Sequence, residues 1–382
     1  MKKSRIAAIV LAAGYSSRMG CFKPLLPLGG TTVLERVIAL FRDEGLPDIR
    51  VVLGYRAEEL VPLLNRAQVP FVWNERFADG MFSSVLKGFE SLRQSSVDLF
   101  FLLPVDIPLV RPWTLRRLLH AFSSGDKKVL YPAFLGKRGH PPLMAMEVAD
   151  QIARMEGAGC LKGALQRFEA QAIQVEMPDE NILSDMDTPA DCRRIQMRWE
   201  DYDIPSVAEC ESIMTRVLPV KESVCRHSRQ VAQLATLMGT ELNRVGCRLN
   251  LGLITAAALL HDIAKGQPGH DRAAASILRE MGFYRAADIG ASHVDIDLRD
   301  GEAVDEAQVV YLADKMTRGE AYLVDFTASF QKKLEQFAGT PTVQQKIRQR
   351  LEHARIIRAR MEELMGQSLD GLVQALASAK GS

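Results

Sequence analysis

The hydrophobic pattern changes once along the 382-residue chain, and this change limits the possible folds more than any other feature. Up to about residue 195, apolar runs of strand length alternate with segments that carry apolar residues at helical spacing. The alternation predicts an α/β domain with a mostly parallel sheet, helices on both faces, and ligands bound beyond the carboxyl ends of the strands. The runs lie at residues 6–11, 49–53, 71–73 and 99–103, and the helical segments at 33–44, 57–65, 83–92 and 113–122.

From about Ile204 onward the strand pattern disappears and only helical patterns remain. Glycines near the ends of these patterns predict helix caps. We expect an α/β domain at residues 1–198, a polar, proline-containing linker at 199–206, an all-helical domain at 207–335 and a helical extension at 336–382. In the extension, the charged helix that carries His353 is expected to be a solvated outer face. The helices are predicted at 221–238, 253–265, 272–281, 306–318 and 343–364, and the glycines are Gly239, Gly266, Gly282 and Gly339.

Composition excludes several classes of protein. A net charge of +1 gives no reason to expect nucleic acid or an anionic membrane as the main partner. The six cysteines contain no C-x-x-C pair, which is typical of a reducing cytosol. The apolar run after the first basic residues is short and leads into a folded pattern, so we expect no signal peptide. No stretch reaches the ~20 apolar residues that span a bilayer. We therefore expect a cytoplasmic protein.

The loop after the first strand has the composition of a phosphate-binding loop. Residues 11–23 read LAAGYSSRMGCFK, in which Ala12, Ala13 and Gly14 allow a ligand to approach the backbone closely. Arg18 and Lys23 supply positive charge for a polyphosphate. The loop matches neither a Walker A sequence nor G-x-G-x-x-G. By composition alone it could equally be a plain strand-to-helix turn with surface charges.

Six sequence blocks of the first half resemble motifs of the MobA/MocA-like family of NTP transferases and occur in the same order as in that family. Members of the family act on molybdenum cofactor and share the Rossmann-like nucleotide-diphospho-sugar transferase fold. The first block is the loop itself, LAAGYSSRMG-CFK. The others read VVLGYRAEEL, WNERFADGMFSSVLKGF, LLPVDIPLV, GKRGHPPLM and DMDTPADC. The last three blocks are most similar to cytidylyltransferases that act on molybdopterin.

The resemblance implies Mg²⁺-dependent transfer of a nucleotidyl group from an NTP. The reaction it favours is transfer from CTP to molybdopterin cofactor, with release of pyrophosphate. Asp106 and Asp187 would hold the Mg²⁺, with Asp185 as a possible substitute ligand. Asp106 could instead be a turn residue before Pro108, and Asp187 could belong to a helix cap with Thr188 and Pro189. A molybdoenzyme or its maturation chaperone is a possible partner.

The resemblance also assigns roles around the nucleotide. Arg18 and Lys23 would bind the triphosphate and act in catalysis, and the backbone at Ala12, Ala13 and Gly14 would donate N–H groups. Ser83 and Ser84 would lie near the base and ribose. His140 either reaches the acceptor or is a structural residue of a Gly/Pro-rich turn. No protein nucleophile is needed, because the acceptor's phosphate attacks directly.

Histidines and aspartates of the second half form a predicted metal site. His261 and Asp262 are adjacent at the end of an apolar helix, where both need polar partners. His227 lies on an earlier helix and Asp314 on a later one, and a bundle can direct these side chains to one interior point. Such a ligand set suits Mn, Fe, Co or Zn.

The order H…HD…D, with the blocks HDIAK and YLADK, resembles the HD superfamily of metal-dependent phosphohydrolases over about residues 220–318. His270 and His293 are similar to the extra histidines of members that hold two metals, and Asp262 would then bridge the ions. Alternatively, these two histidines bind only the substrate phosphate. Lys265, one turn from the pair, could contact the phosphate in catalysis.

Three alternatives remain open at this point. The first half could transfer a nucleotide to a different phosphorylated acceptor. The HD domain could be a regulatory nucleotide sensor instead of a hydrolase. The chain could also be a binding protein that delivers molybdopterin to a client without catalysing a reaction.

Overall fold

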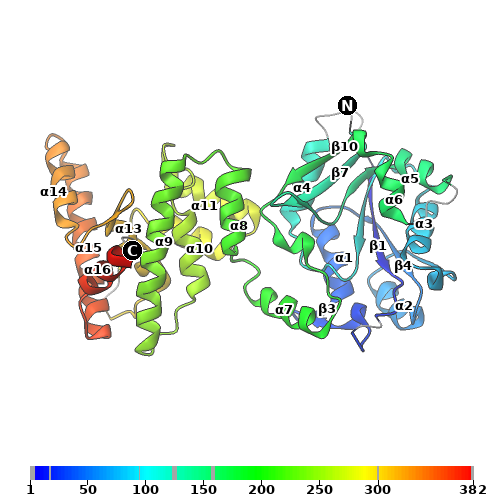
Figure 1. Ribbon diagram of the computed structural model, residues 1–382, viewed down its shortest axis with the longest axis horizontal. Coiled ribbons are helices and arrows are strands. Elements are labelled where there is room, and N and C mark those ends of the chain that lie inside the picture. The colour runs from blue at the N-terminus through cyan, green and yellow to red at the C-terminus, as the bar shows by residue number, and fades with distance from the viewer. Residues whose placement is uncertain are drawn as a thin grey trace. The chain divides into compact units, whose positions relative to one another are not determined.

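The chain folds into two units in the computed structural model, Met1–Tyr202 and Asp203–Ser382, so the division falls inside the predicted linker range. Figure 1 shows an α/β unit and, after it in the sequence, a mostly helical unit. The structure describes residues 5–16, 19–93, 95–122, 127–155, 160–298 and 301–379. None of the described helices is long and apolar enough to cross a membrane.

An eight-stranded sheet forms the centre of the first unit, in the order β10-β7-β9-β6-β1-β4-β5 with β8 paired to β7. The four predicted runs form strands within a residue of their expected bounds, and β1 pairs in parallel with both β4 and β6. β9 is antiparallel to β6 and β7, so the sheet is mostly but not wholly parallel. The strands are β1 (Ile6–Ala12), β4 (Asp48–Leu53), β5 (Phe71–Trp73), β6 (Leu99–Pro104), β7 (Val129–Phe134), β8 (Lys137–Arg138), β9 (Leu143–Ala145) and β10 (Ala172–Glu176).

Helices cover both faces of this sheet, as neighbouring residues of β6 demonstrate. Phe100 packs against Phe89 of α3 on one face, and Phe101 packs against Phe41 of α1 on the other. This alternation follows from the two-residue period of a strand whose faces are both buried. The helices are α1 (Val33–Asp43), α2 (Ala57–Arg66), α3 (Met81–Leu92), α4 (Pro112–Phe122), α5 (Met146–Ala153), α6 (Leu161–Gln166) and α7 (Pro189–Glu200), and a short hairpin pairs β2 (Pro27–Leu28) with β3 (Thr31–Thr32).

The second unit is a helical bundle around α10 (Leu251–Leu260), which packs against α8, α9, α12 and α13. Its sequence, LGLITAAALL, is apolar on nearly every side, as expected for a helix surrounded by others. The other helices are α8 (Val207–Ser212), α9 (Glu222–Arg244), α11 (His270–Met281), α12 (Tyr284–Ser292), α13 (Glu306–Lys315), α14 (Thr327–Gln336), α15 (Pro341–Met365) and α16 (Leu369–Ala379).

Five predictions for the second half need correction. The helix expected at 253–265 ends at Leu260, so His261 and Asp262 lie in the turns that follow it. Two of the predicted glycine caps are wrong: Gly239 lies inside α9, where a Cβ would come within 2.7 Å of Ile254 on α10, and Gly339 follows α14 without a left-handed conformation, the cap of that helix being Phe337. A small hairpin, β11 (Thr317–Arg318) with β12 (Ala321–Tyr322), interrupts the helical pattern. The helix α15 is not a wholly solvated face, which the pocket described below explains.

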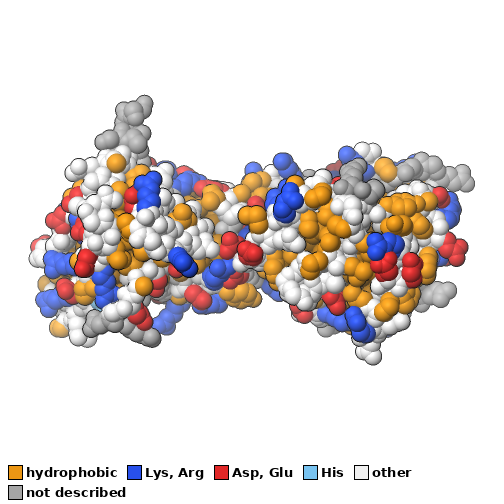
Figure 2. All heavy atoms as spheres, turned by 90° about the horizontal axis from the view of Figure 1, so that it is seen from below, with side chains coloured by type: hydrophobic (Ala, Val, Ile, Leu, Met, Phe, Trp, Pro, Cys, Tyr) orange, Lys and Arg blue, Asp and Glu red, His pale blue; other side chains and the backbone are white. Residues whose placement is uncertain are grey.

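Charges are mixed over the surface. On the face drawn in Figure 2, the Lys and Arg side chains are interspersed with Asp and Glu over each unit. This distribution agrees with the net charge of +1. Any strong binding of anions must therefore depend on local clusters of charge.

Candidate functional sites

The first site lies where β1 and β6 end side by side. Because these strands pair in parallel, the loops that follow them leave the sheet at the same edge. The backbone N–H of Val105 donates to the carbonyl of Leu11 at 3.0 Å and holds the two loops together. Asp106 follows directly, and Lys23 begins a short 3-10 turn at the end of the β1 loop.

Lys23 joins the two predicted metal carboxylates. Its Nζ lies 3.0 Å from Oδ2 of Asp106 and 2.8 Å from Oδ1 of Asp187, residues that are far apart in the sequence. The backbone N–H of Met186 donates to the carbonyl of Asp106 at 2.9 Å, so the main chain also holds the two segments together. Asp185 is exposed on the same segment.

Negative charge dominates this cluster. Burial alone lowers the pKa of Lys23, but its hydrogen bonds to Asp187 and Asp106 and their charges outweigh burial and raise it. The pKa of Asp185 is also raised, first by burial and then by the charges of Asp187 and Asp106. Carboxylate oxygens that repel one another in this way are the ligands that a hard divalent cation such as Mg²⁺ prefers. The residues present therefore fit a divalent metal.

The loop after β1 is partly buried. Ala12 and Ala13 are buried and Gly14 is exposed, so only the last of the three presents its whole backbone to a ligand. A Cβ on Gly54 would lie 2.8 Å from that of Ala13, which shows how closely the loops after β1 and β4 pack. Arg18 lies outside the described residues. Sequence reasoning missed Ser16, whose hydroxyl accepts the backbone N–H of Lys23 at 3.3 Å.

Ser83 and Ser84 are held by a residue that sequence reasoning missed. The side-chain amide of Asn74 donates to both hydroxyls at 2.9 Å. Ser84 is buried, whereas Ser83 lines a cavity of about 630 Å³ together with Asn74 and Trp73. The position of Asn74 directly after β5, at the carboxyl edge of the sheet, was the available signal.

His140 is buried near the carboxylates. Its backbone N–H donates to Ile182 at 2.9 Å, and its Nδ1 has no hydrogen-bond partner among the described residues. Burial lowers the pKa of His140 although the charges of Asp106 and Asp185 act to raise it. The imidazole is therefore neutral at pH 7.

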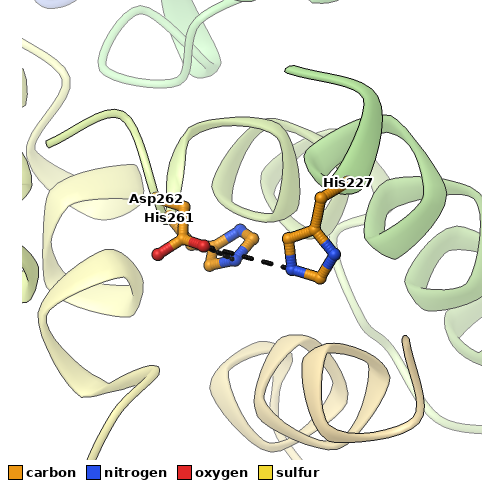
Figure 3. Close-up of side chains that lie close together, drawn as sticks. All are labelled: His227, His261 and Asp262. Atoms are coloured by element: carbon orange, nitrogen blue, oxygen red, sulfur yellow. Dashed lines mark ion pairs between the residues drawn. The ribbon is translucent and has the colours of Figure 1, made fainter. Parts of the chain in front are cut away.

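In the second unit, the carboxylate of Asp262 lies between two groups of histidines. Its Oδ2 is 3.4 Å from Nε2 of His261 and 4.0 Å from Nε2 of His227. Its Oδ1 is 3.6 Å from Nε2 of both His270 and His293. Figure 3 shows the side chain of His227 pointing from its own helix toward His261 and Asp262. The ligand atoms of each group lie within 4.8 Å of one another.

Asp314 completes the first group. Its Oδ1 lies 3.2 Å from Nε2 of His227 and 3.5 Å from Nε2 of His261. The residues come from α9, from the turn after α10 and from α13, so three segments of the bundle converge on one point. All six residues that the sequence predicted for the second-unit metal site are therefore close together.

Hydrogen bonds orient three of the imidazoles. The Nδ1 atoms of His227, His261 and His293 lie 3.2, 2.8 and 2.6 Å from the carbonyls of Gly319, Ala258 and Gly290. An Nδ1–H that donates to a carbonyl leaves Nε2 with a lone pair for a metal. His261 is fully buried, and its Nε2 has no hydrogen-bond partner among the described residues. This arrangement fits divalent metal ions.

Burial and charge perturb the titration of the cluster strongly. Burial alone would raise the pKa of Asp262, but the charge and hydrogen bond of His261 and the hydrogen bonds of His293 and Lys265 hold it well below its usual range. Burial would lower the pKa of His261, yet Asp262 and Asp314 raise it to about 10. The site thus concentrates negative charge that a cation can neutralise.

Two lysines border the cluster. Lys265 forms an ion pair with Asp262 while half of its side chain stays exposed. Lys315, which sequence reasoning did not assign, lies 2.8 Å from Asp314 and donates to the carbonyl of His293 at 2.9 Å. Its place directly after the aspartate in YLADK was the signal that could have indicated it.

The cluster opens into a pocket of about 840 Å³. One wall consists of α14 and α15, through residues that include Phe330, Lys333, Ile347 and Arg350. The expectation that α15 is a solvated outer face was therefore wrong. One face of α15 is buried against the bundle. Its buried residues recur at helical spacing and are Ile347, Ala354, Ile357 and Met361.

Comparison with known proteins agrees with both halves. Residues 8–173 match the model of the MobA-like NTP transferase domain, and residues 224–319 match that of the HD domain. The chain is 28% identical over 201 residues to the molybdenum cofactor cytidylyltransferase of Escherichia coli (strain K12). The aligned region covers 52% of this chain and 99% of that protein. It is 26% identical over 197 residues to a probable molybdenum cofactor guanylyltransferase of Mycobacterium avium (strain 104), covering 50% of this chain and 95% of that one.

Among solved structures, a nucleotidyl transferase from Methanothermobacter thermautotroptrophicus is 25% identical, with a TM-score of 0.45, and covers 51% of this chain and 98% of that one. The two molybdenum cofactor transferases align with about half of this chain, whereas the six histidines and aspartates of the predicted second-unit metal site fall within the range matched by the HD model. The chain therefore combines a MobA-like NTP transferase domain with an HD domain.

Proposed function

We propose that the first unit transfers a cytidylyl group from CTP to molybdopterin cofactor and that the second unit hydrolyses a phosphoester. The contact of Lys23 with both Asp106 and Asp187 at the carboxyl edge of the sheet carries the first part of the proposal. The bridging position of Asp262 between two groups of histidines carries the second. The name of the Escherichia coli relative favours CTP as the nucleotide.

In the transfer reaction, an oxygen of the acceptor's phosphate attacks the α-phosphorus of CTP. The bond from this phosphorus to the bridging oxygen of the β-phosphate breaks, and pyrophosphate leaves. Mg²⁺ held by Asp106 and Asp187, with Asp185 beside them, would neutralise charge on the phosphates. Lys23 would leave its carboxylate partners to contact the triphosphate, and Arg18 together with the backbone at Ala12, Ala13 and Gly14 would hold it.

Around the nucleoside, Ser83 would contact the ribose and base, held in place by Asn74, whereas the buried Ser84 would support Asn74 from behind the cavity wall. These residues position the nucleotide, and the chain needs no nucleophile of its own because the acceptor supplies it. The proposed first unit therefore works by orientation and by electrostatic stabilisation.

The test is the release of pyrophosphate from CTP, GTP, ATP and UTP by the full chain with Mg²⁺ and molybdopterin cofactor. We expect selective release from CTP and a loss of at least about 100-fold in Asp106→Ala, because a carboxylate that holds the catalytic metal is removed. Asp43→Ala, which removes an exposed carboxylate on α1, is the matched control and should retain activity. Release from GTP alone would replace cytidylyl by guanylyl transfer, and no release from any nucleotide would refute the transferase proposal.

In the second unit, His227, His261, Asp262 and Asp314 would hold one divalent metal, and Asp262, His270 and His293 a second. Such a pair supplies an activated water and neutralises the charge that develops on the ester's phosphate. Lys265, half exposed beside Asp262, would contact a phosphate oxygen of the substrate. The Nδ1 contacts with backbone carbonyls keep the imidazoles fixed during the reaction.

Hydrolysis of p-nitrophenyl phosphate and bis(p-nitrophenyl) phosphate with Mn²⁺, Fe²⁺, Co²⁺ or Zn²⁺ tests this second activity. We expect His227→Ala to abolish turnover. His353→Ala changes a histidine that does not line the pocket and should have no effect. No turnover of either ester with any of the metals would instead favour a binding or sensing role for the HD domain.

A further inference from the structure

The pocket of the second unit is larger and more positively charged than the metal cluster requires. Its volume of about 840 Å³ falls in the range of about 300–1,000 Å³ that accommodates organic ligands. Asp262 and Asp314 are the only carboxylates among the described residues that line it. Lysines and arginines outnumber them. A ligand that neutralised these cations would carry more negative charge than a single phosphate.

These cations differ in how far other protein groups already neutralise them. Lys265 and Lys315 pair with the carboxylates of the cluster, and Arg350 pairs with Asp295 at 2.6 and 2.9 Å. By contrast, Lys332 and Lys333 of α14 form no ion pair with any described residue. Their charges therefore remain available to a bound anion.

Lys333 lies in a strongly cationic part of the pocket. Surrounding protein atoms partly desolvate its ammonium and lower its pKa, although its side chain remains exposed. The charges of Lys315, Arg350 and Lys265 lower the pKa further, and only that of Asp314 acts to raise it. A lysine whose neighbours are mainly cations is stabilised when an anion binds between them.

The same wall also offers apolar surface. Phe330 and Ile347 line the pocket beside the lysines, and Leu323 lines it from the segment after the β11–β12 hairpin. An inorganic ion such as pyrophosphate would leave this surface and most of the volume unused. A ligand with several phosphates and an organic body uses both.

We propose that this pocket binds a nucleotide carrying two or more phosphate groups, with one phosphate at the histidine–aspartate cluster and a further phosphate against Lys332 and Lys333. The proposal rests on the hydrolase function proposed above and specifies its substrate class. The wall formed by α14 and α15 lies beyond residue 319, where the match to the HD domain ends. These two helices would thus select the substrate of the site.

Binding to the full-length protein provides the test. In a Lys23→Ala background, which weakens nucleotide binding at the transferase site, the Mn²⁺-loaded chain is titrated calorimetrically with AMP, with the β,γ-imido analogue of ATP and with pyrophosphate. We expect the analogue to bind at least about tenfold more tightly than AMP. Lys332→Ala/Lys333→Ala should weaken the analogue about tenfold or more, and AMP much less, because charge-assisted contacts to the further phosphates are lost.

Two comparisons make the result specific. Lys346→Ala/Arg348→Ala removes two exposed cations of α15 that do not line the pocket and should leave both affinities unchanged. Lys332→Arg/Lys333→Arg keeps the charge and should retain tight binding of the analogue. An equal loss of AMP and analogue affinity in the alanine variant, or no loss, would overturn the role of the lysines. Pyrophosphate that binds as tightly as the analogue would overturn the choice of a nucleotide.

The outcome is separable from that of the hydrolase proposal. If the chain hydrolyses neither nitrophenyl ester but binds the analogue through the two lysines, the hydrolase proposal fails and the assignment of the pocket stands. If it hydrolyses the esters but shows no preference for the triphosphate analogue, the hydrolase proposal stands and the assignment of the pocket fails.

Discussion

At the scale of the residue, Asp262 occupies an unusual position because its two oxygens face different partners. Oδ2 faces His227 and His261, and Oδ1 faces His270 and His293. No other carboxylate among the described residues belongs to both ligand groups. A change at this one residue therefore affects both proposed metal positions.

The first prediction concerns this carboxylate. Asp262→Asn keeps the shape of the side chain but removes its negative charge and one ligand oxygen, so we expect the chain to lose at least one bound metal and about 100-fold or more in phosphoester hydrolysis. Metal content by mass spectrometry after dialysis, together with turnover, measures both effects. Asp288→Asn, at an exposed position on α12, is the control. Full metal content in Asp262→Asn would contradict the bridging role.

The second prediction concerns His140. Burial holds its pKa in the folded state below the usual value, so below about pH 6.5 the unfolded chain binds more protons at this residue than the folded chain. The free energy of unfolding should therefore fall as the pH decreases from 7 to 5. His140→Gln should show a correspondingly weaker dependence on pH.

The measurement is selective for the first unit. All three tryptophans, Trp73, Trp113 and Trp199, lie in it, so tryptophan fluorescence during urea unfolding follows this unit. Identical pH profiles for the wild type and His140→Gln would show that burial of the imidazole does not influence stability.

Residue by residue, the sequence was most informative where a side chain must meet a fixed chemical demand. The pair of His261 and Asp262, within an apolar stretch of sequence, needed polar partners, and the structure supplies them in the turn after α10. Lys332 and Lys333 gave no such signal, because lysines on a polar helix resemble any solvated surface. Asn74 contributes by donating hydrogen bonds to Ser83 and Ser84. These contacts form only in the folded chain, so the sequence alone did not indicate them.

At the scale of the element, the start of α7 links helix formation to the first site. Thr188 accepts the N–H of Asp191 at 3.2 Å and Asp191 accepts the N–H of Thr188 at 2.8 Å, which forms a capping box. Asp187 is the residue just before this cap, and it contacts Lys23. The cap therefore fixes the position of one proposed metal ligand.

The third prediction follows from this cap. Thr188→Ala should lower the stability of the first unit by about 1 kcal/mol and also reduce pyrophosphate release, because Asp187 is no longer held in place. Thr32→Ala removes the equivalent capping box of α1 and is the matched control. It should lower stability by a similar amount but affect activity less. Equal loss of activity in both variants would mean that the effect is one of general stability.

Elements with a strong period were predictable, and those defined by their neighbours were not. The four apolar runs became β1, β4, β5 and β6, because buried parallel strands are apolar on both faces. The three-residue strand β9 carries too few residues for any period, and it exists because β6 and β7 pair with it on either side. The end of α10 at Leu260 was missed because the apolar pattern continues through Ile263 and Ala264.

At the scale of the whole molecule, each unit contains its own core and its own candidate site. The core of the first unit includes Ile9, Phe89 and Phe100, and the second unit buries α10 and the aromatic ring of Tyr311. The residues of each proposed site all come from one unit. The division of the chain was predictable because a change in hydrophobic period reflects a change in architecture.

The fourth prediction is that the two activities can be removed separately. Asp106→Ala should abolish pyrophosphate release and retain phosphoester hydrolysis, whereas His227→Ala should do the reverse. Both activities are measured on both full-length variants under the same conditions. Loss of both activities in either variant would show that the two sites depend on each other.

The main-chain hydrogen bond from Met186 to Asp106 has a consequence for how this fold can diversify. Backbone atoms make this bond, so the bond itself does not require an acidic side chain at position 106 or 187. Mutation can exchange the acidic groups while this main-chain link between their segments persists. A lineage could in this way explore new metals, bases or acceptors without first losing the ability to fold.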